Sequence, residues 1–176
     1  SLGFPVFIAI QRNPFRPSHW QLTAKLTVVT TLFFFGFGAF FWGLFEWNNP
    51  ATIGSYSPGD KILNAIFASV MMRSGGFNLV DMDAITPVST LLTDTLMFIG
   101  GGSGSTAGGV KVTTIAVIAL SILAEARGDQ KVVAFNRTIP ESSLRIAISV
   151  IVMGATVVGV GTASILIISG ADLKEV

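Results

Sequence analysis

The sequence predicts an all-α membrane protein, and two of its properties favour this fold class. Of its 176 residues, 51% are hydrophobic and only 12% are charged, whereas soluble domains carry about 25% charged residues. Residues 26–45 and 146–171 contain no charged side chain, and each segment is long enough to cross a hydrocarbon core of about 30 Å. A bundle of soluble core helices is the alternative, but such helices are amphipathic, and these two segments are apolar on all sides.

The N-terminal residues 1–19 are predicted to hold the end of a preceding membrane helix and a cytoplasmic link. Their charged residues follow the apolar run instead of preceding it, which is not typical of a signal peptide. We therefore expect the chain to be a fragment of a longer protein. His19 is the single histidine and the chain has no cysteine, so neither a disulfide nor a histidine or thiolate metal site is predicted. The net charge of +1 does not indicate nucleic-acid binding.

A shorter apolar segment, residues 60–72, follows the first long helix and is predicted to form a half-helix. At 1.5 Å per residue it reaches about 20 Å, which is too short to cross the membrane. The glycine-containing stretch "RSGGFN" at 73–78 comes next. Non-helical backbone at membrane depth occurs only where protein or a water-filled path surrounds it. A half-helix followed by a short extended segment therefore indicates a cation filter, in which backbone carbonyls replace the hydration shell of the ion and glycine permits the required backbone angles.

The apolar segment 87–124 is divided by a glycine-rich stretch at 100–109. Each glycine in a helix costs roughly 1 kcal/mol relative to alanine, so this stretch is predicted to break the helix into two halves. Its backbone groups then need partners from neighbouring protein, from its own hydroxyls or from pore water. We therefore expect it to lie on a conduction path and to act as a movable gate. The stretch consists of Gly100, Gly101, Gly102, Ser103, Gly104, Ser105, Thr106, Ala107, Gly108 and Gly109.

Other interpretations of the glycine-containing stretches are less favoured by their surroundings. A flexible solvated linker at 100–109 would not lie between "LMFI" and "VTTIAVIALSIL". A phosphate-binding P-loop needs lysine directly after its last glycine, and Val110 intervenes here before Lys111. A dinucleotide fingerprint needs a preceding strand and an acidic residue about 20 residues later; Glu125 lies near that distance, but no such strand is predicted. The segment "TVVGVG" at 156–161 is weakly similar to a potassium-channel filter, but its mid-span position favours close helix packing.

Basic residues predict the orientation of the membrane segments. Residues 11–25 and 125–145 are rich in lysine and arginine, whereas 46–86 contains more acidic than basic residues. Cytoplasmic loops carry the excess of basic residues, so we expect the first two regions inside the cell and the third outside. The three apolar segments then run outward, inward and outward in chain order.

The filter and loop sequences resemble those of the Trk/Ktr/HKT potassium transporter family. "ASVMMRSGGFN" (68–78) is similar to the family's filter region, in which each repeat carries a threonine or serine, a small residue, glycine and phenylalanine. "GGSGSTAGGVKVTT" (101–114) closely resembles the intramembrane loop that breaks the inner helix of the third repeat in the Trk/Ktr branch. "FNRTIP" (135–140) resembles the cytoplasmic link to the fourth repeat. The filter departs from the commoner "TAGF" at Ser74 and Gly75, where Gly75 adds flexibility while the carbonyl chemistry is kept.

The resemblance implies one repeat of a fourfold pseudosymmetric cation pore, built as outer helix, pore half-helix, filter and broken inner helix. Residues 1–19 would end the preceding repeat, 20–124 would form the third repeat, 125–145 a cytoplasmic link, and 146–176 the outer helix of the fourth repeat. One filter segment supplies only a quarter of each oxygen ring, so conduction would need the remaining repeats of the same chain. The resemblance also implies a homodimer, a cytosolic nucleotide-binding regulatory subunit, and a multi-pass location among the lipids of a bacterial-type plasma membrane.

The resemblance also implies a potassium-binding filter and an expected function. The carbonyls of Ser74, Gly75 and Gly76 would bind dehydrated potassium, and Phe77 and Asn78 would shape the outer mouth. Potassium would be the transported ion, carried passively or with sodium or protons as coupling ion. No covalently bound cofactor and no enzymatic activity are expected.

The remaining expectations concern the gate and two basic residues. Residues 100–109 would form a gate just below the filter. Lys111 would point either toward the pore or toward the cytoplasm, and Arg73 would either brace the filter from behind or carry an outer interfacial charge. The alternative function is that of a non-conducting structural membrane protein with a glycine-kinked helix, and a nucleotide-binding oxidoreductase of the soluble type comes third.

Overall fold

The computed structural model describes residues 2–12, 20–73, 75–129 and 131–169. Ser74 of the predicted filter and residues 13–19 of the predicted cytoplasmic link, which include His19, therefore fall outside the described residues. The chain forms two compact units, Ser1–Ala116 and Val117–Val176, and the boundary between them lies within one helix.

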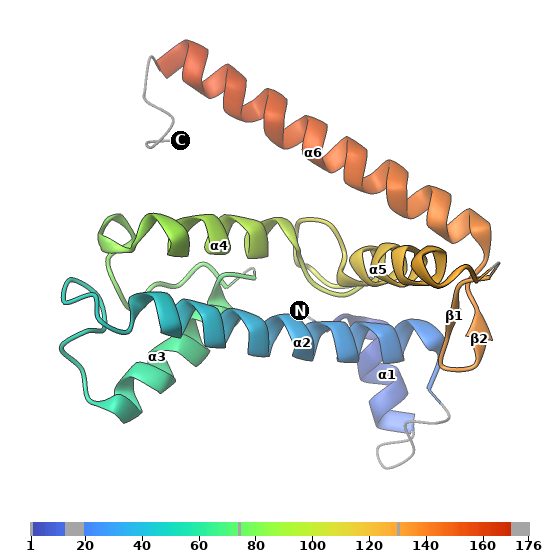
Figure 1. Cartoon of the computed structure of the whole chain (residues 1–176), viewed down its shortest axis with the longest axis horizontal. Helices are drawn as coiled ribbons and strands as arrows, with labels where there is room; N and C mark the ends of the chain where they lie inside the picture. The colour runs from blue at the N-terminus through green and yellow to red at the C-terminus, as the bar shows by residue number, and fades with distance from the viewer. Residues whose placement is uncertain (1, 13–19, 74, 130, 170–176) are drawn as a thin grey trace. The chain divides into compact units, whose positions relative to one another are not determined.

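The described residues are mostly helical (Figure 1). In chain order the elements are α1 (Phe4–Arg12), α2 (Leu22–Glu46), α3 (Pro58–Met71), a 3₁₀ turn (Met82–Ala84), α4 (Pro87–Phe98), α5 (Val112–Arg127), β1 (Val133–Ala134), β2 (Arg137–Thr138) and α6 (Glu141–Ser169). The apolar segment 26–45 lies within α2, which also includes the charged residues at its two ends. Helix α6 begins several residues before the apolar segment 146–171, because the acidic Glu141 suits the first turn of a helix.

Among the described residues, two helices are long and apolar enough to cross a membrane, namely α2 and α6. Their mean hydropathy over the most apolar window is 1.9 and 2.3. Core helices of a soluble protein pass the same test, but they are mostly buried. Here 17% of the α2 window and none of the α6 window is buried, so the soluble-bundle alternative is not favoured.

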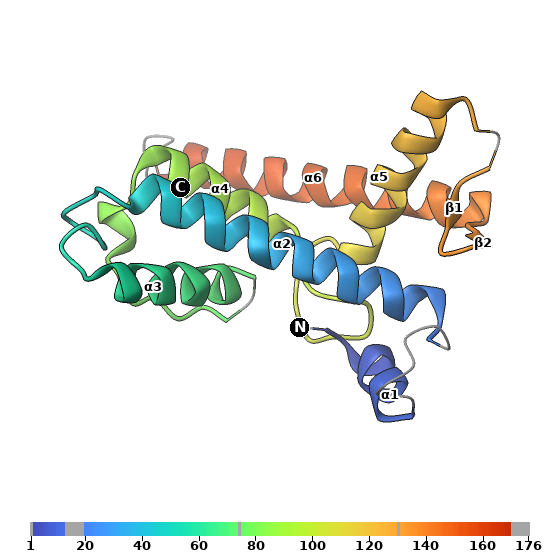
Figure 2. The ribbon, with the colours of Figure 1, turned by 60° about the horizontal axis from the view of Figure 1, so that its bottom comes forward.

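In the first unit, α3 and α4 pack against α2 (Figures 1 and 2). Small residues permit the close approach of α2 and α3. A Cβ atom on Gly38 would lie 2.6 Å from the Ser69 hydroxyl, and one on Gly43 would lie 3.0 Å from Cβ of Ala65. The Ser69 hydroxyl donates to the carbonyl of Phe35 at 2.7 Å, so the half-helix is bonded to the backbone of the outer helix.

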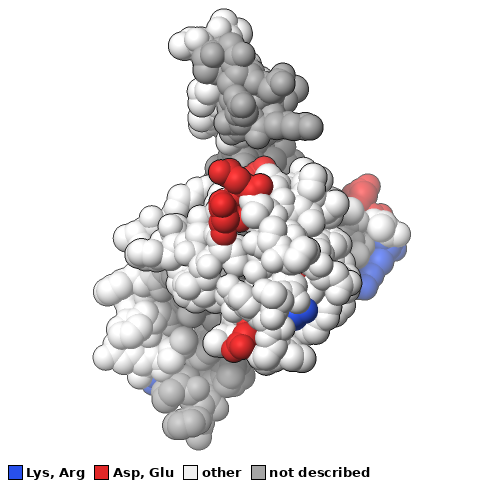
Figure 3. Space-filling model, turned by 90° about the vertical axis from the view of Figure 1, so that its left-hand side faces the viewer, with Lys and Arg blue, Asp and Glu red and all other residues white. Residues whose placement is uncertain are grey.

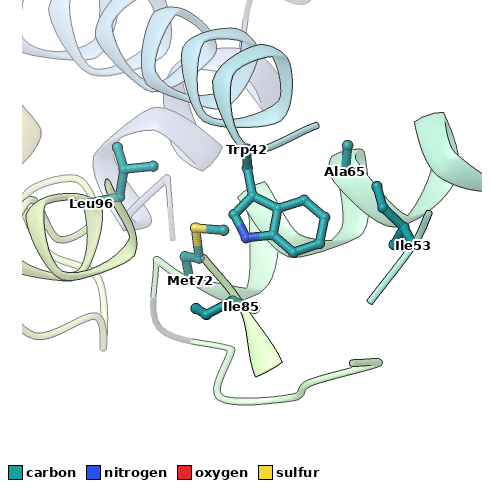
Figure 4. Packing of buried hydrophobic residues seen from close by; sticks show 6 residues of the cluster. All are labelled: Trp42, Ile53, Ala65, Met72, Ile85 and Leu96. Carbon is teal, nitrogen blue, oxygen red and sulfur yellow. The ribbon is translucent and has the colours of Figure 1, made fainter. Parts of the chain in front are cut away.

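A compact apolar core holds these three helices together (Figure 4). It consists of Trp42, Ile53, Ala65, Met72, Ile85 and Leu96. Trp42 comes from α2 and is 2% exposed, Met72 directly follows α3, and Leu96 comes from α4. Because Met72 belongs to the core, the chain enters the predicted filter segment from a fixed point.

The starts of α3 and α4 carry matching local signals. Ser57 accepts a hydrogen bond from the backbone N–H of Asp60, and Thr86 accepts one from the backbone N–H of Ser89. A proline follows each of these capping residues, as expected at the first helical position. Helix α3 therefore begins at Pro58, two positions before the half-helix limit expected from apolar residues alone.

The second unit contains most of α5, the hairpin β1–β2 and α6. The sequence did not predict the short hairpin, in which Val133 pairs with Thr138 and Ala134 with Arg137. The two turn residues, Phe135 and Asn136, have φ angles of 50° and 61°. Two successive positive φ angles are typical of the tight turn whose twist matches a two-stranded hairpin, so local turn geometry explains these strands.

Candidate functional site

The predicted filter segment reverses direction at the C-terminal end of α3. The backbone N–H groups of Gly75 and Gly76 both donate to the carbonyl of Met71, at 2.9 and 3.2 Å. Gly76 has a φ angle of +70°, the left-handed conformation that commonly ends a helix at glycine. The start of the segment is thus fixed by hydrogen bonds to the last turn of the half-helix.

The two described glycines of the filter have different structural requirements. A Cβ atom on Gly75 would overlap the sulfur of Met71 and lie 3.0 Å from its Cα. A Cβ atom on Gly76 would meet nothing within 4 Å, so at this position only the positive φ angle requires glycine. Gly75 therefore serves close packing, and Gly76 serves the backbone conformation.

The carbonyls of the predicted filter segment are available to a ligand. Gly75, Gly76, Phe77 and Asn78 are all exposed, and within the described parts of the chain their carbonyl oxygens accept no hydrogen bond. A carbonyl that has no protein partner is bonded by water or by a cation. The segment can therefore present several backbone oxygens to an ion, as a carbonyl filter requires.

The glycine-rich stretch forms a loop with a closed neck between α4 and α5. Ile99 and Val110 form a parallel bridge. The N–H of Gly100 donates to Val110 at 2.9 Å, and the N–H of Val112 donates to Gly101 at 3.2 Å. Since Ile99, Val110 and Val112 are buried, the chain leaves and re-enters the helical path at one fixed place.

Arg73 lies between the filter and this neck. Its side chain is 4% exposed, which contradicts the outer-interface alternative. One terminal nitrogen donates to the carbonyl of Thr31 in α2 at 3.2 Å, and the other donates to the carbonyl of Gly100 at 3.0 Å. The residue that precedes the filter is therefore bonded directly to the first glycine of the loop.

Comparison with known proteins decides the family. Residues 16–139 match the family model described as TrkH, cation transport protein. The chain belongs to the TrkH family of cation transport proteins. This confirms the resemblance seen in the filter and loop sequences, and it places the chain among cation transporters and not among enzymes. With the apolar α2 and α6, it identifies a membrane protein.

Curated relatives of this TrkH-family chain have related names. The Ktr system potassium uptake protein B of Bacillus subtilis (strain 168) is 32% identical over 175 residues, covering 99% of this chain and 39% of that protein. The protein of the same name from Vibrio alginolyticus is 33% identical over 157 residues, covering 89% and 34%. The potassium/sodium uptake protein NtpJ of Enterococcus hirae is 34% identical over 107 residues, covering 61% and 24%. The chain thus spans two fifths or less of the length of these relatives.

Specific structural constraints require glycine at several positions of the loop in this TrkH-family chain. A Cβ atom on Gly100 would overlap the carbonyl of Gly108, and one on Gly102 would overlap the carbonyl of Leu2. Gly104 and Gly109 have φ angles of +71° and +73°. These positions therefore need glycine for close approach or for a positive φ angle, which is a reason for glycine besides mobility.

The tip of the loop, residues 103–107, contacts α1, and part of its hydrogen bonding is local to the loop. The N–H of Phe4 donates to the carbonyl of Gly104 at 3.2 Å. The hydroxyl and the N–H of Ser105 both donate to the carbonyl of Gly102, at 2.7 and 3.2 Å. Ser103 and Thr106 are exposed. Unlike the neck, the tip is held by few backbone bonds.

Lys111 bonds back to the loop. Its ammonium group donates to the carbonyl of Ala107 at 2.6 Å. The sequence left two directions open for this side chain, toward the pore or toward the cytoplasm. In the structure the side chain contacts the returning limb of the loop, and the two directions stay predictions.

Sequence reasoning missed Glu46, the last residue of α2. Its side chain is 0% exposed. One carboxylate oxygen accepts hydrogen bonds from the N–H and hydroxyl of Thr86 and from the hydroxyl of Ser89. The other accepts from Asn49 and Thr52, each at 2.7 Å. In the sequence, Glu46 has no local feature that distinguishes it from any other charged residue at a helix end.

Proposed function

We propose that this chain is part of the pore-forming subunit of a potassium transporter, with the carbonyls of Ser74, Gly75 and Gly76 as its contribution to the filter. The observation that carries the proposal is the exposed run from Gly75 to Asn78, whose carbonyls accept no hydrogen bond from the described residues. The printed names of two relatives, both potassium uptake proteins, support potassium as the ion. Phe77 and Asn78 shape the outer mouth.

Charges near the proposed filter and on its approach favour a cation. The C-terminal end of α3 carries the negative end of the helix dipole, and the proposed filter begins there. Asp81 and Asp83 follow the filter segment in the chain and Asp60 lies at the start of α3; all three are exposed, and Figure 3 shows acidic side chains on an otherwise largely uncharged face. Such a distribution raises the local concentration of cations.

The complete transporter needs more than this chain. Three further filter segments from the remaining repeats would complete each oxygen ring, and we propose a homodimer with a cytosolic nucleotide-binding regulatory subunit. Transport is passive or coupled to sodium or protons; NtpJ, one relative, is named as a potassium/sodium uptake protein. The proposed location is the plasma membrane, in a multi-pass arrangement.

The loop at 100–109 is proposed to gate the pathway below the filter. The bond between Arg73 and Gly100 supports the closeness of filter and loop. Because the neck at Ile99 and Val110 is bridged, we propose that the tip at 103–107 moves while the neck stays in place. Motion of the tip is also the smaller change, since it breaks few backbone bonds.

The filter proposal predicts a specific effect of Gly76→Ser in the complete protein. A left-handed conformation costs a non-glycine residue roughly 1–2 kcal/mol, whereas the added side chain meets no neighbour within 4 Å. We expect about tenfold weaker potassium affinity or potassium-over-sodium selectivity, measured as uptake and as growth at low potassium of cells that lack their own potassium uptake.

Gly36→Ser is the matched control for this experiment. Gly36 lies within α2, has open space around its Cβ position and has no positive φ angle. Its substitution should leave affinity and selectivity unchanged. If Gly76→Ser also leaves both unchanged, or if the complete wild-type protein reaches the membrane without restoring growth, the proposed filter is wrong.

The proposed orientation predicts that 48–59 is external and 125–140 is cytoplasmic. Ser55 and Asp129 are both exposed and can be replaced by cysteine one at a time in a cysteine-free complete protein. An impermeant thiol reagent should label Ser55→Cys in intact cells and Asp129→Cys only after the membrane is opened. Labelling of both from one side would contradict the orientation.

A further inference from the structure

We propose that Arg73 is a positioning residue that couples ion binding in the filter to the conformation of the glycine loop. The inference rests on the proposed function of the two segments and adds a physical link between them. Arg73 directly precedes the filter in the chain, and its guanidinium reaches the loop neck. A change at either segment is therefore transmitted through one side chain.

The geometry of Arg73 suits a mechanical link. Its guanidinium donates to Thr31, in the middle of α2, and to Gly100, at the loop neck. The guanidinium carbon also lies 6.0 Å from the ring centroid of Phe34, at the limit of a cation–π contact. The side chain thus has a fixed support on the outer helix and a second contact on the loop.

Arginine is the side chain that this position requires. Its planar guanidinium presents several donors in a rigid fork and stays charged, so it can serve two carbonyls from different elements together. A lysine is a point donor on a flexible stem and does not reproduce a fork. Charge-assisted hydrogen bonds are also stronger than neutral ones, which suits a contact that has to transmit a displacement.

Both backbone polar groups of Gly100, its N–H and its carbonyl, form hydrogen bonds. Its N–H donates to Val110 across the neck, and its carbonyl accepts from Arg73. A Cβ atom at Gly100 would overlap the carbonyl of Gly108, so the two limbs of the loop are in direct contact here. A rearrangement of the loop that tilts this peptide changes the position of Arg73, and with it the backbone that leads into Gly75.

Coupling of this kind is reciprocal. If the loop conformation alters the filter, then potassium in the filter must alter the loop by the same factor. The prediction can therefore be tested by binding alone, without transport. Thr106 at the exposed tip provides the reporter position, as Thr106→Cys in a cysteine-free complete protein.

The experiment measures the rate at which a thiol reagent modifies Thr106→Cys in potassium and in N-methylglucamine at equal ionic strength. We expect potassium to change the rate about fivefold or more. Arg73→Gln should abolish this dependence, and Arg73→Lys, which keeps the charge without the fork, should reduce it by at least half. Thermal unfolding with and without potassium, on the same proteins, reports whether the filter still binds the ion.

Ser69→Ala is the matched control. Ser69 also links α3 to a backbone carbonyl of α2, but within the described residues its hydroxyl forms no hydrogen bond with the loop. The potassium dependence of modification should persist in this variant. A dependence that persists in both Arg73 variants, or that disappears equally in Ser69→Ala, would overturn the coupling role.

The two proposals fail in distinguishable ways. If potassium stabilises the wild-type protein against thermal unfolding but leaves the modification rate unchanged, the coupling is wrong and the filter stands. If potassium has neither effect, the proposed filter itself is wrong. If Arg73→Gln does not fold, the Arg73→Lys comparison alone decides between a link and a purely structural contact.

Discussion

Replacement of Glu46 by alanine is expected to destabilise the complete protein by about 3 kcal/mol or more, because a set of buried and half-buried donors loses its shared acceptor and each unsatisfied buried group costs about 1–3 kcal/mol. The donors are the side chains of Asn49, Thr52, Thr86 and Ser89 and the N–H of Thr86. They come from the loop after α2 and from the start of α4. Glu46 therefore joins three parts of the chain where α2 ends and α4 begins.

The charge of Glu46 also has a favourable position. Thr86 is the N-cap of α4, so the carboxylate lies next to the positive end of that helix dipole. Glu46→Gln keeps the shape but replaces one acceptor oxygen by an NH₂ group, which faces donors instead of accepting from them. We expect an intermediate loss of stability for this variant.

The measurement is thermal unfolding of the purified complete protein in detergent, together with its abundance in the membrane. Glu125→Ala is the control, because Glu125 is an exposed glutamate and surface substitutions usually change stability by less than about 0.5 kcal/mol. Equal unfolding temperatures for Glu46→Ala and Glu125→Ala would show that the hydrogen bonds of Glu46 do not hold the end of α2 and the start of α4 together.

Deletion of Ser103–Ala107 is expected to raise potassium flux on the order of tenfold, equivalent to about 1.4 kcal/mol off the barrier. The deletion removes the contact of Gly104 with Phe4 and the contact of Ala107 with Lys111. It leaves in place the bridge between Ile99 and Val110 that closes the neck. Flux should also become less dependent on a regulatory subunit, while the selectivity set by Gly76 and its neighbours is kept.

Uptake and selectivity of the deletion variant are measured in the complete protein, alone and with its regulatory subunit. Ser105→Ala serves as the control, since it removes one hydroxyl that bonds to Gly102 and keeps the length of the loop. A deletion variant that folds and reaches the membrane but carries no flux would show that the loop is structural, and the gate proposal would be wrong.

The sequence by itself determined the long helices, the helix break and the family. Apolar length is a local property, so the segments at 26–45 and 146–171 could be recognised without tertiary contacts. The helix penalty of glycine is also local, and helices α4 and α5 end and begin on either side of 100–109. The family could be recognised from short motifs, because these depend only on the order of residues in the chain. The match to the family model confirms it.

Only the tertiary structure decided how the site is held together. Arg73 bonds to residues 42 and 27 positions away, and Glu46 bonds to Ser89, which lies 43 positions away. The sequence does not distinguish a charged side chain at the edge of an apolar segment that is exposed to water from one that bonds to a buried partner. Burial and partner choice depend on which helices meet, because the cost of a buried charge is offset only by hydrogen bonds from distant segments.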